Sequence, residues 1–224
     1  MATRLELITV EPDGPPDASV IWLHGLGADG YDFEPIVAEL GLGKGYGIRF
    51  LFPHAPVRPI TINAGMEMRG WYDIDEQGLN QRVDERGIRE SAAAVAALLD
   101  AEIATGIDNR RIVLAGFSQG GAIALHLGLR YPQRLGGILA LSTYLPLKDT
   151  LSSEADAAQE SLSIFFGHGS YDPLIPEALG SDSARLLEAA GYVVEYHTYP
   201  VQHTVSQEEI RDISGWLVRR LPPG

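Results

Sequence analysis

The sequence predicts an α/β protein with a mostly parallel central sheet and helices on both of its faces. Short apolar runs of strand length alternate with longer segments of helical periodicity from one end of the chain to the other. That alternation is typical of a parallel sheet covered by helices on both sides. The 224 residues contain no internal repeat, low-complexity tract or dividing linker, so we expect one domain over residues 1–224.

The expected strands are short and rich in β-branched or aromatic residues. They cover residues 5–10, 19–23, 48–52, 112–116, 135–141, 162–167 and 192–199. Turn residues follow the first strand at 11–16, and Pro53 stops the third. In such sheets the active site lies at the carboxyl ends of the strands, so loops distant in sequence converge there.

The expected helices follow a period of 3.6 residues. They cover residues 31–40, 84–105, 118–131, 177–190 and 206–221, and the last begins with the capping-box pair Ser206 and Glu209. Residues 146–161 form a polar excursion with some helix. Residues 54–82 are expected to be irregular, and a loop of this length inside a compact domain is usually functional.

Composition narrows the class of protein. The formal net charge is −13 with no basic cluster, which disfavours nucleic acid and anionic membrane as partners. The absence of cysteine rules out disulfides, thiolate metal sites and a cysteine nucleophile. The N-terminal residues carry no signal pattern, and no apolar run approaches the ~20 residues of a membrane span. We therefore expect a cytoplasmic protein without stable membrane insertion.

The central motif of the chain is Gly116-Phe117-Ser118-Gln119-Gly120, which follows an apolar strand and opens a helix rich in small residues. This strand–turn–helix layout is typical of a nucleophile elbow, which holds a serine hydroxyl out of the sheet. Glycines flank the serine because strand and helix crowd together there. The motif alone is a weak signal, and its context makes Ser118 the candidate nucleophile.

A nucleophilic serine needs a base and an acid that orients the base, and after an elbow the chain order is serine, acid, histidine. Asp172 follows an expected strand end, in a Gly-Ser-Tyr-Asp-Pro loop, and is the candidate acid. Asp149 and Asp156 are its nearest rivals, but they lie in the polar excursion without a preceding strand end.

His203 lies between the last strand and the last helix and is the candidate base. The other histidines fit this role less well. His197 falls within a strand, His126 on the helix after the elbow and His54 before the elbow, while His168 is expected to shape the Asp172 loop.

Two backbone N–H groups are needed to stabilise the negative charge that develops on the substrate oxygen. One is expected from Gln119, the residue after the nucleophile, and the other from the glycine-rich loop that begins at His24. Leu26 is the first choice in that loop and Gly27 the second. The glycine spacing fits neither a dinucleotide-binding fingerprint nor a phosphate-binding P-loop.

Six ordered motifs carry a family resemblance over nearly the whole chain. They are His24-Gly25-Leu26-Gly27, Phe52-Pro53-His54-Ala55-Pro56, Trp71-Tyr72-Asp73, Gly116-Phe117-Ser118-Gln119-Gly120-Gly121, the loop 167–173 and His203. This set resembles the small carboxylesterases, or phospholipase/carboxylesterase group, which includes acyl-protein thioesterases. The resemblance implies an α/β-hydrolase fold with little or no cap, no cofactor and no metal, and the hydrolysis of carboxylic esters or thioesters.

The same resemblance carries the triad over to Ser118, Asp172 and His203, and the oxyanion donors to Leu26 and Gln119. The family usually has glycine before and serine after the base, where this chain has Gln202 and Thr204. We expect activity to survive this departure because His203 itself is kept. The resemblance leaves open a homodimer.

A second group of residues is expected to contact the substrate. Trp71 and Tyr72 are interpreted either as a wall of the acyl pocket or as packing beneath a loop. Softer candidates for the pocket are Ile60, Ile62 and Leu145.

The resulting hypothesis is a serine carboxylesterase that acts through an acyl-enzyme on esters of short or medium acyl chains. The alternative is an acyl-protein thioesterase or lysophospholipase, which would use the same catalytic residues. A non-enzymatic binding protein on the same fold is disfavoured because all three triad residues are present. A peptidase is a further rival, whereas a dienelactone hydrolase usually resembles a cysteine-nucleophile site that this chain cannot build.

Overall fold

A seven-stranded sheet forms the centre of the computed structural model, which describes residues 5–43, 45–75 and 83–224. The strand order is β1-β3-β2-β6-β7-β8-β9, and every neighbouring pair is parallel except the antiparallel edge pair β1–β3. The strands are β1 (Leu7–Val10), β2 (Ala18–Leu23), β3 (Ile48–Pro53), β6 (Ile112–Phe117), β7 (Gly137–Leu141), β8 (Ser163–Gly169) and β9 (Val193–Tyr199). The predicted mostly parallel sheet is confirmed.

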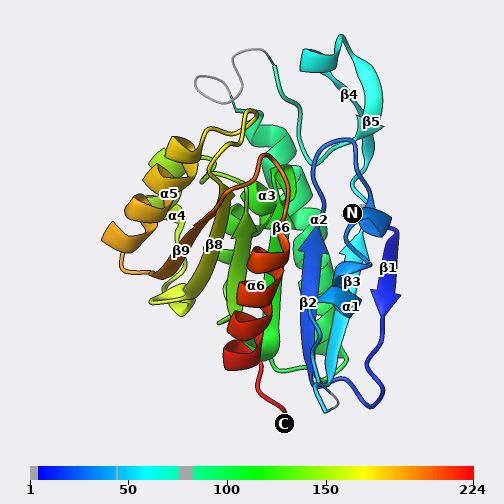
Figure 1. Ribbon diagram of the computed structural model, residues 1–224. Coiled ribbons are helices and arrows are strands. Elements are labelled where there is room, and N and C mark those ends of the chain that lie inside the picture. Colours follow the sequence, from blue (N-terminus) through cyan, green and yellow to red (C-terminus); the bar gives the residue numbers. More distant parts are fainter. Residues whose placement is uncertain (1–4, 44, 76–82) are drawn as a thin grey trace.

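Helices cover both faces of the sheet (Figure 1). They are α1 (Ile36–Glu39), α2 (Glu85–Ala104), α3 (Gln119–Gly128), α4 (Leu151–Glu154), α5 (Glu177–Ala189) and α6 (Gln207–Arg220). Short 3-10 helices span Gly30–Asp32, Thr61–Asn63, Asn109–Arg111, Lys148–Thr150 and Ala157–Gln159. One apolar core joins the sheet to α2, α3 and α5, and a second joins the opposite face to α1 and α6.

The helix predicted over residues 31–40 is much shorter in the structure. Only the 3-10 turn Gly30–Asp32 and the single turn α1 form there. Pro35 accounts for the break because proline lacks the N–H that a continuous helix needs and disfavours helical backbone in the residue before it. Pro35 instead precedes the first residue of α1.

The section predicted as irregular contains a β-hairpin. Strands β4 (Val57–Ile60) and β5 (Met66–Arg69) pair antiparallel and rise above the end of the main sheet (Figure 1). Pro59 within β4 hid this strand from the sequence pattern, because proline is tolerated only in edge strands. Residues 76–82 of the same section lie outside the described residues, as do residues 1–4 of the expected N-terminal segment.

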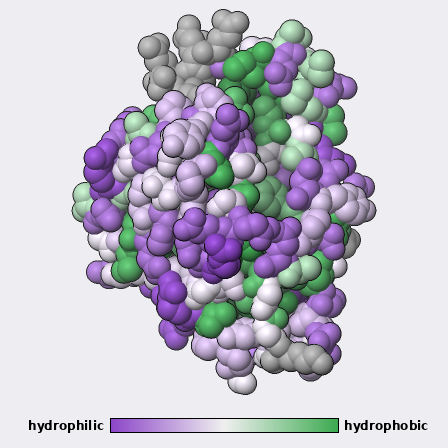
Figure 2. Space-filling model, in the orientation of Figure 1, coloured by the Kyte–Doolittle hydropathy of each residue, from purple (hydrophilic) through white to green (hydrophobic). Residues whose placement is uncertain are grey.

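The face of the molecule in Figure 2 is mostly polar, with apolar side chains at several places. In Figure 2 apolar side chains gather around the β4–β5 hairpin at the top of the view. Val57, Ile62 and Met66 of this region are exposed. Over the described parts of the chain, none of the helices combines the length and the apolar character that crossing a membrane requires.

Two glycines let β6, α3 and β2 approach closely. A Cβ on Gly116 would overlap the Gly120 backbone, and a Cβ on Gly120 would overlap the carbonyl groups of Leu23 and His24. The obstacles are backbone atoms, which cannot rotate away as a side chain would. The tight turn between β6 and α3 therefore requires both glycines.

We expect Gly120→Ala to lower the free energy of unfolding by about 3 kcal/mol or more, because overpacking against rigid backbone is strongly destabilising. Gly215→Ala in α6 is the matched control, since its Cβ would meet only Arg219 Nη1 at 3.7 Å. This control should raise stability by about 0.5–1 kcal/mol, as alanine favours helix over glycine. Urea denaturation measures both, and equal stabilities of the two variants would contradict the packing argument.

Glu209 is a buried carboxyl group at the start of α6. Its Oε2 accepts from the Ser206 N–H at 3.4 Å, and the Ser206 hydroxyl accepts from the Glu209 N–H at 3.0 Å, which confirms the predicted capping box. Its Oε1 has no hydrogen-bond partner among the described residues. Burial raises the pKa of Glu209 to about 8, so the folded protein holds this group protonated at neutral pH.

Glu209 should therefore make stability fall as pH rises. In the unfolded chain a glutamate ionises near pH ~4.3, so between that pH and about 8 the folded state binds more protons than the unfolded state. We expect wild type to lose about 2–4 kcal/mol relative to Glu209→Gln between pH 5.5 and 8.5. Urea denaturation of both proteins at the two pH values tests this, and a constant difference in stability between them would disprove it.

Candidate active site

Ser118 lies in the turn between β6 and α3 with φ 55° and ψ −119°. Positive φ is rare for a residue other than glycine and is typical of strained functional turns. Two hydrogen bonds hold it there. The Ser118 N–H donates to the Leu141 carbonyl at 2.9 Å, and the Thr143 hydroxyl donates to the Ser118 carbonyl at 2.7 Å. The end of β7 and the loop that follows it therefore stabilise the strained conformation.

Asp172 and His203 form a short hydrogen bond. His203 Nδ1 lies 2.6 Å from Asp172 Oδ2, and the Asp172 side chain is fully buried. The other carboxylate oxygen, Oδ1, accepts from the N–H groups of Leu174 and Ile175 at 2.9 Å each. Because an ionised carboxylate only accepts hydrogen bonds, Nδ1 carries the proton and Nε2 is left as the basic nitrogen.

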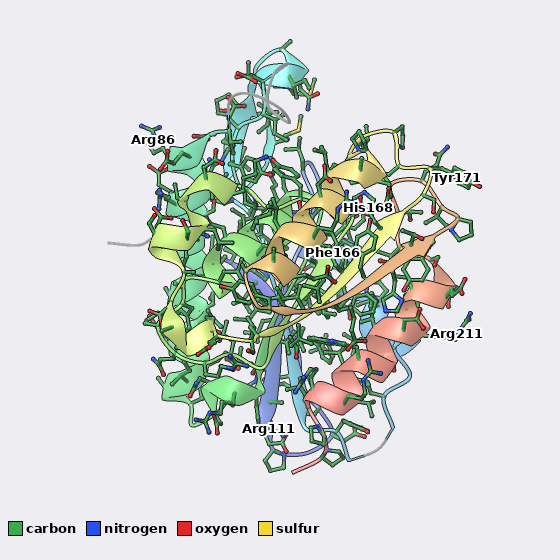
Figure 3. All side chains as sticks on the ribbon, turned by 90° about the vertical axis from the view of Figure 1, so that its left-hand side faces the viewer. Arg86, Arg111, Phe166, His168, Tyr171 and Arg211 are labelled. Atoms are coloured by element: carbon green, nitrogen blue, oxygen red, sulfur yellow. The ribbon has the colours of Figure 1, made fainter. Side chains whose placement is uncertain are left out.

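The loops that carry Asp172 and His203 are joined through their backbones. Tyr171 N–H donates to the Val201 carbonyl at 3.0 Å, and Ser170 N–H donates to the Tyr199 carbonyl at 2.8 Å. Figure 3 shows Tyr171 extending outward from its loop while His168 lies within the molecule. The candidate acid and the candidate base, 31 residues apart in sequence, are therefore held in a fixed position relative to each other.

The rival residues occupy other environments. His126 is buried in α3, where burial and then Arg130 lower its pKa to about 4. His197 stacks on Phe165 with ring centroids 5.0 Å apart, and His54 Nδ1 accepts from the Gly30 N–H at 3.1 Å. His168 donates from Nε2 to the Ile175 carbonyl at 2.9 Å, as expected for a residue that shapes the Asp172 loop. Asp149 lies in a 3-10 helix, and Asp156 caps another.

The glycine-rich loop after β2 distinguishes the two candidate oxyanion donors. The Gly27 N–H donates to the Arg69 carbonyl at 2.8 Å, whereas the Leu26 N–H has no acceptor within the described part of the chain. The Gln119 N–H is the first of α3, where helical geometry provides no carbonyl partner. This pattern leaves the N–H groups of Leu26 and Gln119 available to a ligand.

The His24 side chain supports that loop, a role the sequence did not reveal. Nδ1 lies 2.7 Å from the Gly25 carbonyl, and the Ala55 N–H donates to Nε2 at 3.0 Å. This arrangement defines the tautomer with its proton on Nδ1. Burial lowers the pKa of His24, which keeps the ring neutral.

The Gln119 side chain links the turn at Ser118 to the segment 71–72. The Trp71 N–H donates to Gln119 Oε1 at 3.0 Å, and Gln119 Nε2 donates to the Tyr72 carbonyl at 2.8 Å. The indole N–H of Trp71 donates to the His24 carbonyl at 2.8 Å. The predicted aromatic pair thus connects the loop after β2 with the start of α3.

A pocket of about 900 Å³ opens beside Ser118 and His203. Its apolar and aromatic lining residues are Leu26, Phe33, Ile62, Tyr72, Ile74, Phe117, Tyr144, Leu174 and Ile175. The hydroxyls of Tyr72 and Tyr144 lie 3.0 Å apart, and burial raises the pKa of both. A pocket of this size and character suits a mostly apolar ligand.

The residues predicted to contact substrate fall into two groups. Tyr72 and Ile62 line the pocket. Trp71, Ile60 and Leu145 are buried and absent from its lining. Ile60 packs behind the pocket wall, near Leu26 at Gly70.

Several lining residues were not predicted, notably Phe33, Ile74, Phe117, Tyr144 and the pair Leu174 and Ile175. Phe117, next to the serine, packs on the His203 ring with centroids 4.6 Å apart. The only sequence signal for Phe117, Leu174 and Ile175 was that they lie close to Ser118 or Asp172 along the chain. The described residues contain no cluster of three or more histidine, aspartate and glutamate side chains suited to a metal ion.

Comparison with known proteins identifies relatives over the full length of this architecture. A family model described as Phospholipase/Carboxylesterase matches residues 6–219. Acyl-protein thioesterase 1 of Cryptococcus neoformans is 34% identical over 99% of this chain and 100% of its own length. Acyl-protein thioesterase 1 of Gibberella zeae is 39% identical over 92% of each chain.

Solved structures agree with the sequence relatives. Arabidopsis thaliana SOBER1 superposes with a TM-score of 0.86 at 33% identity, covering 91% of this chain and 99% of its own. Zea mays acyl-protein thioesterase 2 gives a TM-score of 0.86 at 28% identity, covering 96% and 99%. The chain therefore belongs to the phospholipase/carboxylesterase family of α/β-hydrolases, enzymes that hydrolyse carboxylic esters or thioesters.

Proposed function

We propose that this protein hydrolyses acyl thioesters through a covalent acyl-enzyme, with Ser118 as nucleophile, His203 as base and Asp172 as the acid that orients the base. The observation that carries the proposal is the 2.6 Å bond between His203 Nδ1 and Asp172 Oδ2, formed beside a strained serine in one apolar pocket. A nucleophile, an oriented base and a place for an acyl chain are the parts that acyl transfer needs.

In the proposed reaction, His203 Nε2 takes the Ser118 proton as the serine oxygen bonds to the acyl carbon. The N–H groups of Leu26 and Gln119 stabilise the oxyanion. The C–S bond then breaks, and the leaving sulfur receives the proton from Nε2. Water attacks the acyl-serine while Nε2 accepts its proton, and the proton returns to Ser118 as the fatty acid departs.

We place thioesters before simple esters of short or medium chains because the relatives are named acyl-protein thioesterases. The sequence alone had put the ester hypothesis first. The pocket supports acyl chains longer than acetyl, since its volume and apolar lining exceed what an acetyl group needs. Ester hydrolysis remains part of the proposed chemistry because the same residues would perform it. We propose the cytoplasm as the compartment, from the acidic, cysteine-free composition.

Substitution of Ser118 or Asp172 should strongly reduce the hydrolysis of an octanoyl thioester. The rate is measured from the thiol that is released. We expect Ser118→Ala to lower kcat at least ~10⁴-fold, and Asp172→Asn to lower it ~10³–10⁴-fold because the imidazole loses its orienting acceptor. Ser170→Ala, an exposed serine in the Asp172 loop, is the matched control and should keep wild-type kcat. Wild-type rates in Ser118→Ala would refute the proposed nucleophile.

Filling the pocket should change the preferred chain length. Ile74 lines the pocket and is only half-buried, so Ile74→Trp can place its ring in that space. We expect kcat/KM for a dodecanoyl thioester to fall about tenfold or more relative to an acetyl thioester, because a steric block acts on the longer chain. Leu186→Trp, at an exposed position of α5, should leave the ratio unchanged. An unchanged ratio in Ile74→Trp would remove this pocket as the acyl site.

A further inference from the structure

A second cleft lies against His203, next to the pocket already described. It has a volume of about 430 Å³ and is bounded by the α1 region and by the segment from His203 to Ile210. Asp32, Phe33, Phe117 and His203 line both spaces. Ser118, Leu26 and Gln119 line only the larger pocket. The two spaces thus meet at the proposed base.

That division matches the two halves of a scissile acyl bond. The acyl carbon must lie beside the nucleophile and the oxyanion donors, whereas the leaving atom must lie beside the base that returns the proton. We propose that the smaller cleft binds the leaving group of the substrate, and that its acidity selects leaving groups that carry a positive charge. This inference rests on the proposed function and names the substrate class for it.

The cleft is held between α1 and α6. Gln207 Nε2 donates to Glu39 Oε2 at 2.5 Å, and the Ser214 hydroxyl donates to the Leu40 carbonyl at 2.7 Å. Ile36 and Ile210 are buried beneath it, and both belong to the same apolar core. The cleft therefore has fixed walls and an apolar floor.

The charged side chains that line the cleft are acidic. Asp32 and Glu39 line it, Asp32 and Asp75 line the larger pocket, and neither arginine nor lysine appears among the described residues that line either space. Glu39 already accepts from Gln207, while Asp32 is exposed and shared by both spaces. The carboxylates would attract a cationic leaving group and repel an anionic one, because both effects act over the short distances within the cleft.

The test uses three octanoyl thioesters that differ in the charge of the thiol: octanoylthiocholine (cationic), S-octanoyl-N-acetylcysteamine (neutral) and S-octanoyl-3-mercaptopropionate (anionic). Thiol release gives kcat/KM for each at low salt. We expect the cationic thioester to exceed the anionic one about tenfold, and 0.5 M NaCl to reduce that ratio, because salt screens exposed charges.

Asp32→Asn locates the effect. Its amide oxygen can still accept from the Asp29 N–H, which donates to Asp32 Oδ2 at 2.7 Å, so the local turn is kept. We expect this variant to reduce the cationic-to-anionic ratio about threefold or more. Asp13→Asn removes the same charge in the loop before β2, at the amino end of that strand and outside the lining of both spaces, and should keep the wild-type ratio.

The outcomes separate the two proposals. Equal kcat/KM for all three thioesters would overturn the charge-selective leaving-group cleft and leave thioester hydrolysis standing. Equal reductions of the ratio in Asp32→Asn and Asp13→Asn would assign it to the net charge of the protein and would also overturn the cleft. Failure of the folded wild-type protein to cleave any of the three would overturn the proposed function itself.

Discussion

The close backbone approach at the turn between β6 and α3 is the constraint on which the site depends. Gly116 and Gly120 have no Cβ, so α3 can start against the carbonyl end of β2. This proximity brings the first N–H of α3 near the loop that carries Leu26, and it presents Ser118 at the edge of the sheet in a strained conformation. A larger residue at either glycine would separate Ser118, the proposed nucleophile, from the N–H groups proposed to stabilise the oxyanion.

Hydrogen bonds then extend this arrangement to segments distant in sequence. The Gln119 amide holds the backbone of Trp71 and Tyr72, and His24 connects the loop after β2 to Ala55. The acid and base loops are joined through Tyr171 and Val201. Because these polar groups are buried and partnered, each loop is restrained by another, and the fold holds in place the loops that carry the proposed triad and oxyanion donors.

The two spaces that meet at His203 differ in size and in how apolar their linings are. The larger one is mainly apolar, although Asp32 and Asp75 also line it, whereas the smaller one has an apolar floor with Asp32 and Glu39 at its edge. The proposed substrate, with a fatty acyl half and a cationic leaving half, follows from these two linings. The family relationship supports hydrolysis of esters or thioesters, and the cleft lining is the basis of the proposed discrimination among leaving groups.

Hydrophobic periodicity and turn residues were sufficient to predict the mostly parallel sheet and most helix boundaries, because these features depend on local patterns. Chain order and the elbow motif were sufficient to propose Ser118, Asp172 and His203 as the triad. The sequence pattern did not predict the β4–β5 hairpin because Pro59 lies within a short edge strand. The helix over residues 31–40 was predicted too long because Pro35 breaks it. The bond from His203 to Asp172, the Gln119 cross-link and both clefts depend on contacts between segments far apart in the chain. Such contacts arise only when the sheet brings its loops together, so tertiary packing alone decides them.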